Sequence, residues 1–252
     1  EQIRIAFQKN INVFIEKPLC LNNNELKLIM DDFYDSQSQL SCNFILRKER
    51  RFEVLKNNIK KGLLGEIYQV EGSYDYGRFY KITSGWRGKI PYYSVFHGGA
   101  IHLIDLFGWL LKSNFSPEFV LGTNAAIKGD DQLEKSVRYD NILAVGKFKN
   151  NIIGRISSNY CTTSKHYHQI RIYGTLGIFS HEFGRCFYSF GDDRDNNIQY
   201  DTQDFPSSGK GDYLIDFVHH LLGYEKDIIT AEEVFEVMKT SINVEDLLLK
   251  EV

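Results

Sequence analysis

The sequence predicts a short α/β segment followed by a larger α+β domain. Three observations predict this fold class: a fully apolar run at 13–15, a helical pattern between that run and a second apolar run, and strand patterns that alternate apolar and polar residues from residue 67 onward. We therefore expect a small parallel sheet, then a large, mostly antiparallel sheet with one open face and helices on the other.

The first elements form a βαβ pattern. The run at 13–15 reads Val-Phe-Ile and stops at Glu16-Lys17-Pro18, which is typical of a strand covered on both faces. Asparagines at 22–24 offer N-cap side chains for a helix over 25–34, whose apolar residues recur at helical spacing. A second apolar run at 42–46 predicts another strand, and strand, helix and strand together make a βαβ unit.

The remaining elements predict the α+β part. Residues 50–61 are expected to form a helix that ends at Gly62. The alternating pattern over 67–76 predicts a strand with one solvated face. Turn signals separate further predicted strands at 142–148, 152–159, 169–173 and 177–181, and helices are expected at 213–222 and 231–249. We place the boundary between the two parts near residue 47, as 1–47 and 48–252.

Composition excludes several classes of protein. The 252 residues carry 30 Lys and Arg against 33 Asp and Glu, a net charge of −3, so a nonspecific nucleic-acid binder is not expected. No apolar run reaches the length of about 18 residues that a membrane span requires. The four cysteines are scattered without a C-x-x-C pair, so we expect neither a zinc site nor a disulfide framework. A cytoplasmic protein is the expectation.

Lys17 is the first candidate functional residue. In open α/β sheets, ligands bind outside the carboxyl ends of the strands, where Glu16, Lys17 and Pro18 lie. Proline keeps its predecessor out of the α region, so Lys17 is expected to be extended. A lysine there could bond a substrate hydroxyl and share its proton while a hydride leaves the same carbon. The alternative is a turn that ends the strand, with a solvated lysine.

Histidines supply the other candidates. Gly98 and Gly99 permit close backbone approach before an apolar helix, and His102 lies near its expected start. The positive end of the helix would favour a neutral imidazole, available for acid–base chemistry. The alternative is a buried structural histidine. His166 and His168 share one face of a strand, where a solvated or substrate-facing pair is favoured over half a metal site.

Taken in this order, the motifs resemble those of the Gfo/Idh/MocA family (glucose–fructose oxidoreductase/inositol dehydrogenase). Glu16-Lys17-Pro18 is similar to the EKP motif of that family, and the segment 98–105 is similar to its glycine-rich, histidine-containing helix start. Arg47, at the end of the run 43–47, resembles the arginine that opens the second domain, and 60–67 resembles the entry into the large sheet. Trp86-Arg87, the turn 174–177 and the last predicted helix also fall at the family's positions.

The resemblance implies a fold, an activity and a set of site residues. Residues 1–47 would be the remnant of a Rossmann-like dinucleotide-binding domain, and 48–252 a domain that binds substrate and oligomerises. The cofactor would be NAD or NADP and the substrate a sugar, nucleotide-sugar or cyclitol, with a homodimer or homotetramer formed through the large sheet. The implied residues are Lys17 and His102 for catalysis, Glu16, Lys17 and Pro18 for the cofactor, and Arg47, Trp86, Arg87, His97 and Asp105 for the substrate.

The chain departs from the family pattern at two places. The residue four positions before His102 is Gly98, where the family often has an aspartate, so His97 or Asp105 is the candidate to replace it. No G-x-G-x-x-G occurs, which implies that roughly 60–90 residues of the dinucleotide-binding domain are missing. Two functions remain open: an oxidoreductase in truncated form, or a non-catalytic substrate-binding and dimerisation module.

Overall fold

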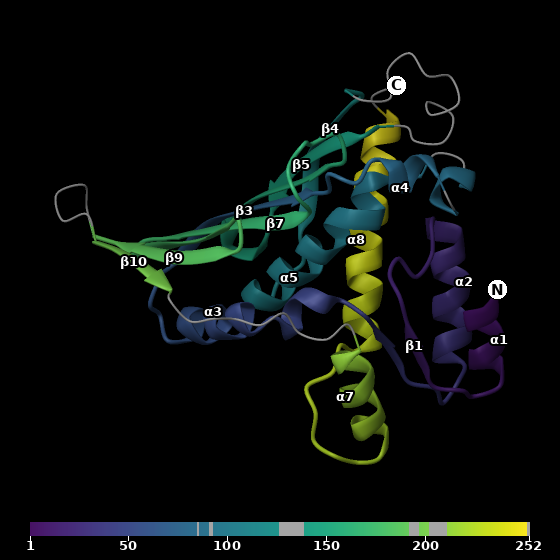
Figure 1. Cartoon of the computed structure of the whole chain (residues 1–252). Coiled ribbons are helices and arrows are strands. Elements are labelled where there is room, and N and C mark those ends of the chain that lie inside the picture. The colour runs from purple at the N-terminus through teal and green to yellow at the C-terminus, as the bar shows by residue number, and fades with distance from the viewer. Residues whose placement is uncertain (85, 91–92, 126–138, 192–196, 202–210, 251–252) are drawn as a thin grey trace.

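The structure is a computed structural model that describes residues 1–84, 86–90, 93–125, 139–191, 197–201 and 211–250. Figure 1 shows a small layer near the N-terminus beside a broad sheet with helices against one face. The long helix α8 (Ala231–Lys250) runs between these two parts and packs on both. None of the described helices is long and apolar enough to cross a bilayer.

The small layer confirms the predicted βαβ unit. β1 (Val13–Ile15) and β2 (Leu40–Cys42) pair in parallel and are joined by α2 (Asn23–Tyr34). The side chain of Asn22 caps α2 by accepting a hydrogen bond of 2.9 Å from the backbone N–H of Glu25. α1 (Gln2–Gln8) precedes β1 and lies against α2.

The predicted strand at 42–46 is wrong in its placement. The pairing ends where Ile15 lies opposite Cys42, and residues Ile45–Lys48 form a 3-10 helix instead. β1 offers no partner beyond Ile15, so Phe44 and Leu46 reach the core from this turn, where both are fully buried.

Among the described residues, the large sheet has eight strands in the order β10-β9-β8-β7-β3-β6-β5-β4, and the β3–β6 pair is the only parallel one there. Its alternating burial confirms the predicted mostly antiparallel, open-faced sheet. β4, β9 and β10 were not predicted. The strands are β3 (Ile67–Asp75), β4 (Ser116–Thr123), β5 (Asn141–Lys147), β6 (Ile153–Asn159), β7 (Tyr167–Gly174), β8 (Gly177–Glu182), β9 (Arg185–Phe190) and β10 (Asn197–Asp201).

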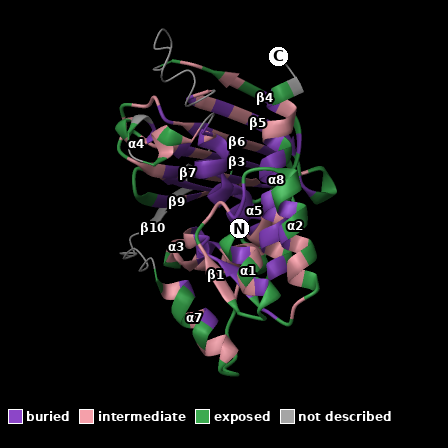
Figure 2. Cartoon of the chain, turned by 90° about the vertical axis from the view of Figure 1, so that its right-hand side faces the viewer, coloured by how far each residue is buried: buried purple, intermediate pink, exposed green. Residues whose placement is uncertain are grey.

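Helices cover one face of this sheet, as expected. They include α3 (Arg50–Lys60), α5 (Ile101–Leu111) and α8, while α7 (Asp212–Leu221) projects away from the sheet and buries Tyr213 and Phe217 (Figures 1 and 2). The close approach of α5 to β3 requires glycine, because a Cβ at Gly72 would lie 2.8 Å from the ring of Phe107. Short helical turns occur at α4 (Tyr80–Thr83), Arg87–Lys89 and Lys149–Asn151.

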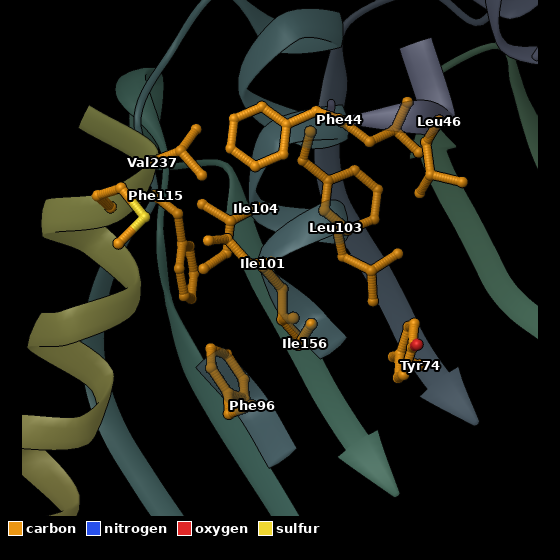
Figure 3. Close-up of a cluster of buried hydrophobic side chains, with 14 of the residues drawn as sticks. Phe44, Leu46, Tyr74, Phe96, Ile101, Leu103, Ile104, Phe115, Ile156 and Val237 are labelled. Atoms are coloured by element: carbon orange, nitrogen blue, oxygen red, sulfur yellow. The ribbon is translucent and has the colours of Figure 1, made fainter. Parts of the chain in front are cut away.

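The hydrophobic core fills the space between α5, α8 and the sheet. Figure 3 shows Ile101 and Ile104 of α5 between Val237 of α8 and Ile156 of β6. Figure 2 shows the buried residues gathered in this layer. The core fixes α5 against the sheet, and the candidate functional residues lie at the start of this helix and on the strand ends next to it.

Candidate functional site

Lys17 lies directly after β1 and reaches the glycine pair. Its Nζ donates a hydrogen bond to the backbone carbonyl of Gly98, and the Lys17–Pro18 peptide bond is cis. Burial lowers the pKa of Lys17 to about 8, while Glu16 opposes this shift and the charge of Arg87 adds to it. Near neutral pH this amine can therefore both give and take a proton.

Glu16 and Pro18 flank the lysine in different environments. Glu16 is exposed, and its Oε1 accepts a hydrogen bond of 2.7 Å from the side chain of Asn43. Pro18 lines a mostly apolar cavity of about 280 Å³ that extends past Gly98 to α8. This cavity therefore borders one of the predicted cofactor-binding residues.

His102 lies in the first turn of α5 and is buried. A π-helical turn over Phe96–Ala100 leads directly into α5, so His102 is not at a free helix N-terminus. Its pKa is well below the ordinary value because of burial, with smaller effects of Lys17 and of His168. The predicted neutral imidazole is thus present, but the predicted cause, the helix end, is corrected to burial. The Nδ1 atom is buried and has no hydrogen-bond partner in the described part of the chain, so no carbonyl there holds it.

His97 is held at both ring nitrogens. Nδ1 lies 2.7 Å from the hydroxyl of Ser241 on α8, and Nε2 lies 2.7 Å from the carbonyl oxygen of Cys20. A carbonyl only accepts, so Nε2 carries the proton and Nδ1 accepts from the serine. His97 thereby ties α8 to the segment that follows the lysine, and neither nitrogen is left for a substrate.

Arg47 and Asp105 bind each other. The Arg47 guanidinium contacts both carboxylate oxygens of Asp105 at 2.5–3.0 Å and reaches Glu233 of α8 at 2.7 Å. Asp105 is fully buried, and this burial raises its pKa to about 6 against the opposing charge of Arg47. The pair lines a cavity of about 470 Å³ beside Trp109. The structure therefore joins these two predicted substrate residues in an ion pair that links α5 to α8.

Trp86 and Arg87 lie on the short turn before the glycine pair. The Arg87 guanidinium stacks 4.3 Å above the ring of exposed Trp86, and its Nε donates a hydrogen bond of 3.3 Å to the hydroxyl of Tyr93. The positive charge of Arg87 contributes to the lowered pKa of Lys17.

The sequence reasoning missed a cluster of aromatic rings on the sheet face next to His102. Tyr74 of β3 lies opposite His168 of β7, with ring centroids 5.0 Å apart, and His168 lies 6.1 Å from His102. His166 contacts Tyr74 at 5.1 Å and Tyr76 at 4.9 Å. The sequence signal that could have indicated this cluster is the i, i+2 spacing that Tyr74 and Tyr76 share with His166 and His168. Among the described residues, no group of three His, Cys, Asp or Glu could hold a metal ion.

Comparison with known proteins identifies the fold and the family. Residues 56–244 match the model of the oxidoreductase family, C-terminal alpha/beta domain (GFO_IDH_MocA_C). No curated protein sequence matches the chain significantly. A putative oxidoreductase from Thermotoga maritima aligns with a TM-score of 0.80 at 19% identity, over 100% of this chain and 74% of that one.

Two named dehydrogenases share the fold. The myo-inositol 2-dehydrogenase of Lactobacillus plantarum aligns with a TM-score of 0.78 at 17% identity, over 99% of this chain and 74% of that one. The UDP-N-acetylglucosamine 3-dehydrogenase GnnA of Acidithiobacillus ferrooxidans aligns with a TM-score of 0.72 at 15% identity, over 98% and 73% of the two chains. Because the family model covers most of its 252 residues, the chain belongs to the Gfo/Idh/MocA oxidoreductase family.

Proposed function

We propose that this chain carries the substrate site of an oxidoreductase that uses NAD or NADP and acts on a carbinol or ketone carbon of a sugar, nucleotide-sugar or cyclitol. Family membership supports the reaction class. The names of two relatives of similar fold, an inositol dehydrogenase and a UDP-sugar dehydrogenase, support the substrate class. The observation that carries the proposal is the pairing of Lys17 with the backbone of Gly98 beside the buried, neutral His102.

Lys17 and His102 divide the proton chemistry. With its pKa near 8, Lys17 suits a general acid–base at physiological pH, because such groups work best near the operating pH. His102 keeps its imidazole neutral and has a buried Nδ1 without a partner, which would bond the substrate hydroxyl or a bound water. A nicotinamide ring bound at this site would supply hydride transfer.

The residues present fit one end of the cofactor. Lys17 and Pro18 lie at the carboxyl end of a parallel strand, beside the cavity of about 280 Å³. These residues would hold the nicotinamide end. No G-x-G-x-x-G occurs in the 252 residues, so this glycine fingerprint does not hold the pyrophosphate within them.

The test is turnover with the two cofactors. The chain is mixed with NAD⁺ or NADP⁺ and with myo-inositol or UDP-N-acetylglucosamine, and nicotinamide reduction is followed by absorbance. Lys17→Met and His102→Gln should each lower the rate at least about 100-fold, because general acid–base groups contribute roughly that factor or more. Lys27→Met, on the exposed face of α2, is the matched control. Full turnover in both site variants would refute the assigned roles.

A second candidate function is a non-catalytic module that binds substrate and pairs with a second copy. The open face of the large sheet favours it, because Phe119, Leu121 and Ile153 project there with about half of their surface exposed. The homodimer proposed for either function would bury this face. Calorimetric titration with NAD and NADP separates the candidates, since micromolar binding of either cofactor would rule out the module.

A further inference from the structure

The ring cluster beside His102 contains buried nitrogens without partners. His102 and His168 are 5% and 9% exposed, and Nδ1 of His102 and Nε2 of His168 have no hydrogen-bond partner among the residues that the structure describes. Nε2 of half-buried His166 is also unpartnered. Buried polar atoms normally have partners, because leaving them unpaired costs free energy. Three such nitrogens on adjacent rings therefore point to a ligand that carries hydroxyl groups.

These imidazoles are neutral and cannot supply a counter-charge. Burial lowers the pKa of His166 to about 4 and that of His168 to about 3. The other groups that lower these two pKa values are three cations, Lys17, Arg78 and Lys81, and two histidines, His166 and His181. Neutral imidazole rings donate and accept hydrogen bonds, which suits hydroxyl groups.

Arg78, Lys81 and Arg87 form no ion pair with a carboxylate of the described residues. The guanidinium of Arg78 lies 5.7 Å from the centre of the Tyr76 ring, which contacts His166, and Arg87 rests on Trp86 and Tyr93. The buried Arg47, by contrast, has two carboxylate partners. The site thus carries excess positive charge next to neutral rings that can bind hydroxyl groups.

Building on the proposed function, we infer that the substrate of this site carries a carboxylate or a phosphate, with Arg78 and Arg87 supplying its counter-charge and the histidines of β7 bonding its hydroxyls. A guanidinium presents its N–H groups in a fork that matches both anions, whereas a neutral polyol would gain nothing from this positive charge. The inference narrows the proposed substrates to those that carry an anion, namely a sugar acid, a sugar phosphate or a nucleotide-sugar, and excludes a neutral sugar or cyclitol.

The test compares one neutral and two charged sugars on the whole chain. Calorimetry at pH 7 measures the affinity for D-glucose, D-glucuronate and D-glucose 6-phosphate. We expect one or both anions to bind at least about tenfold more tightly than glucose, since a charge-assisted hydrogen bond contributes roughly that factor. The anion that binds more tightly identifies the group as carboxylate or phosphate.

Charge variants locate the binding group. Arg78→Gln and Arg87→Gln should each weaken anion binding about three- to tenfold and weaken glucose binding less than anion binding, while Arg87→Lys should restore part of the loss of anion binding. Arg185→Gln, at the exposed start of β9, should have no effect. The inference is overturned if neither anion binds more tightly than glucose, or if both glutamine variants bind the anion as the parent does. Either result would leave the oxidoreductase proposal unaffected. Tight anion binding without hydride transfer would instead overturn the oxidoreductase proposal and leave the inference about the anion unaffected.

Discussion

The ammonium group of Lys17 hydrogen bonds to the backbone carbonyl of Gly98, a residue 81 positions away in the sequence. The family resemblance leads one to expect an aspartate at position 98, but a Cβ built there would lie 2.0 Å from the hydroxyl oxygen of Tyr93. The lysine therefore faces a neutral carbonyl. A carboxylate would have raised the pKa of Lys17, and with a carbonyl instead, burial prevails and lowers it.

Substitutions at Gly98 and Tyr93 should have coupled effects on the free energy of unfolding. Gly98→Ala is expected to lower the free energy of unfolding by about 1–3 kcal/mol, because the added methyl group overlaps the Tyr93 hydroxyl. Tyr93→Ala combined with Gly98→Ala should lose less than the sum of the two single changes. Urea unfolding measures all three variants.

A second glycine of the same segment provides the control. A Cβ at Gly108 of α5 would be 3.6 Å from its nearest neighbour, an ordinary contact, so Gly108→Ala should be neutral or slightly stabilising. If Gly98→Ala unfolds at the same urea concentration as Gly108→Ala, the packing of Tyr93 against Gly98 does not exist in solution.

Lys17 should lose its proton at unusually low pH. Competitive acetylation with mass spectrometry should give a midpoint near pH 8, because burial disfavours the ammonium form. Arg87→Gln should move this midpoint upward, since it removes a positive charge that opposes protonation. A midpoint above 10 in the parent chain would contradict the buried position of the amine.

The sequence predicted elements whose signals are local. The apolar run at 13–15 stops at a proline, and the Asn22 cap marks the start of α2, so both were found. β4 carries Pro117 and Gly122, which weaken a strand pattern, and it lies at a sheet edge where pairing on one side suffices. β2 was misplaced because the register with β1, and not apolarity, decides where the pairing ends.

The candidate site was predictable in part for the same reason. Lys17 and His102 occupy positions that short motifs mark, and the structure places them after β1 and in the first turn of α5. Contacts between distant segments could not be found without the fold. The pairing of Tyr74 with His168 depends on the β3–β7 register, and the contact between Tyr93 and Gly98 depends on how the turn before α5 packs.

Replacing only one member of the ion pair between Arg47 and Asp105 should strongly lower the free energy of unfolding. Asp105→Leu or Arg47→Met should each lower the free energy of unfolding by about 3–5 kcal/mol, because each leaves a buried charge without its partner. Replacing both, as Arg47→Met with Asp105→Leu, should cost clearly less than the sum. Thermal and urea unfolding of the three variants measure the coupling, and additive losses would show that the two side chains do not interact.

His168 should make the chain sensitive to acid. Its pKa is lowered from 6.5 to about 3 by burial and by neighbouring histidines, so between these pH values the unfolded chain binds a proton that the folded chain does not. Stability contributed by this residue is therefore complete above pH 6.5 and is lost as the pH falls. From pH 7 to pH 4 the loss is about 3 kcal/mol, since a tenfold difference in proton affinity between the folded and unfolded chain corresponds to about 1.4 kcal/mol.

The substitution His168→Phe isolates this contribution, because phenylalanine keeps a ring against Tyr74 and His102 but cannot be protonated. Urea unfolding at pH 7 sets the baseline of each protein, which removes any packing cost of the substitution from the comparison. Between pH 7 and pH 4 the parent should lose about 3 kcal/mol more than the variant. Equal losses would mean that His168 is protonated in the folded chain at pH 4, and therefore that its ring is open to water and not enclosed between β3, β7 and α5.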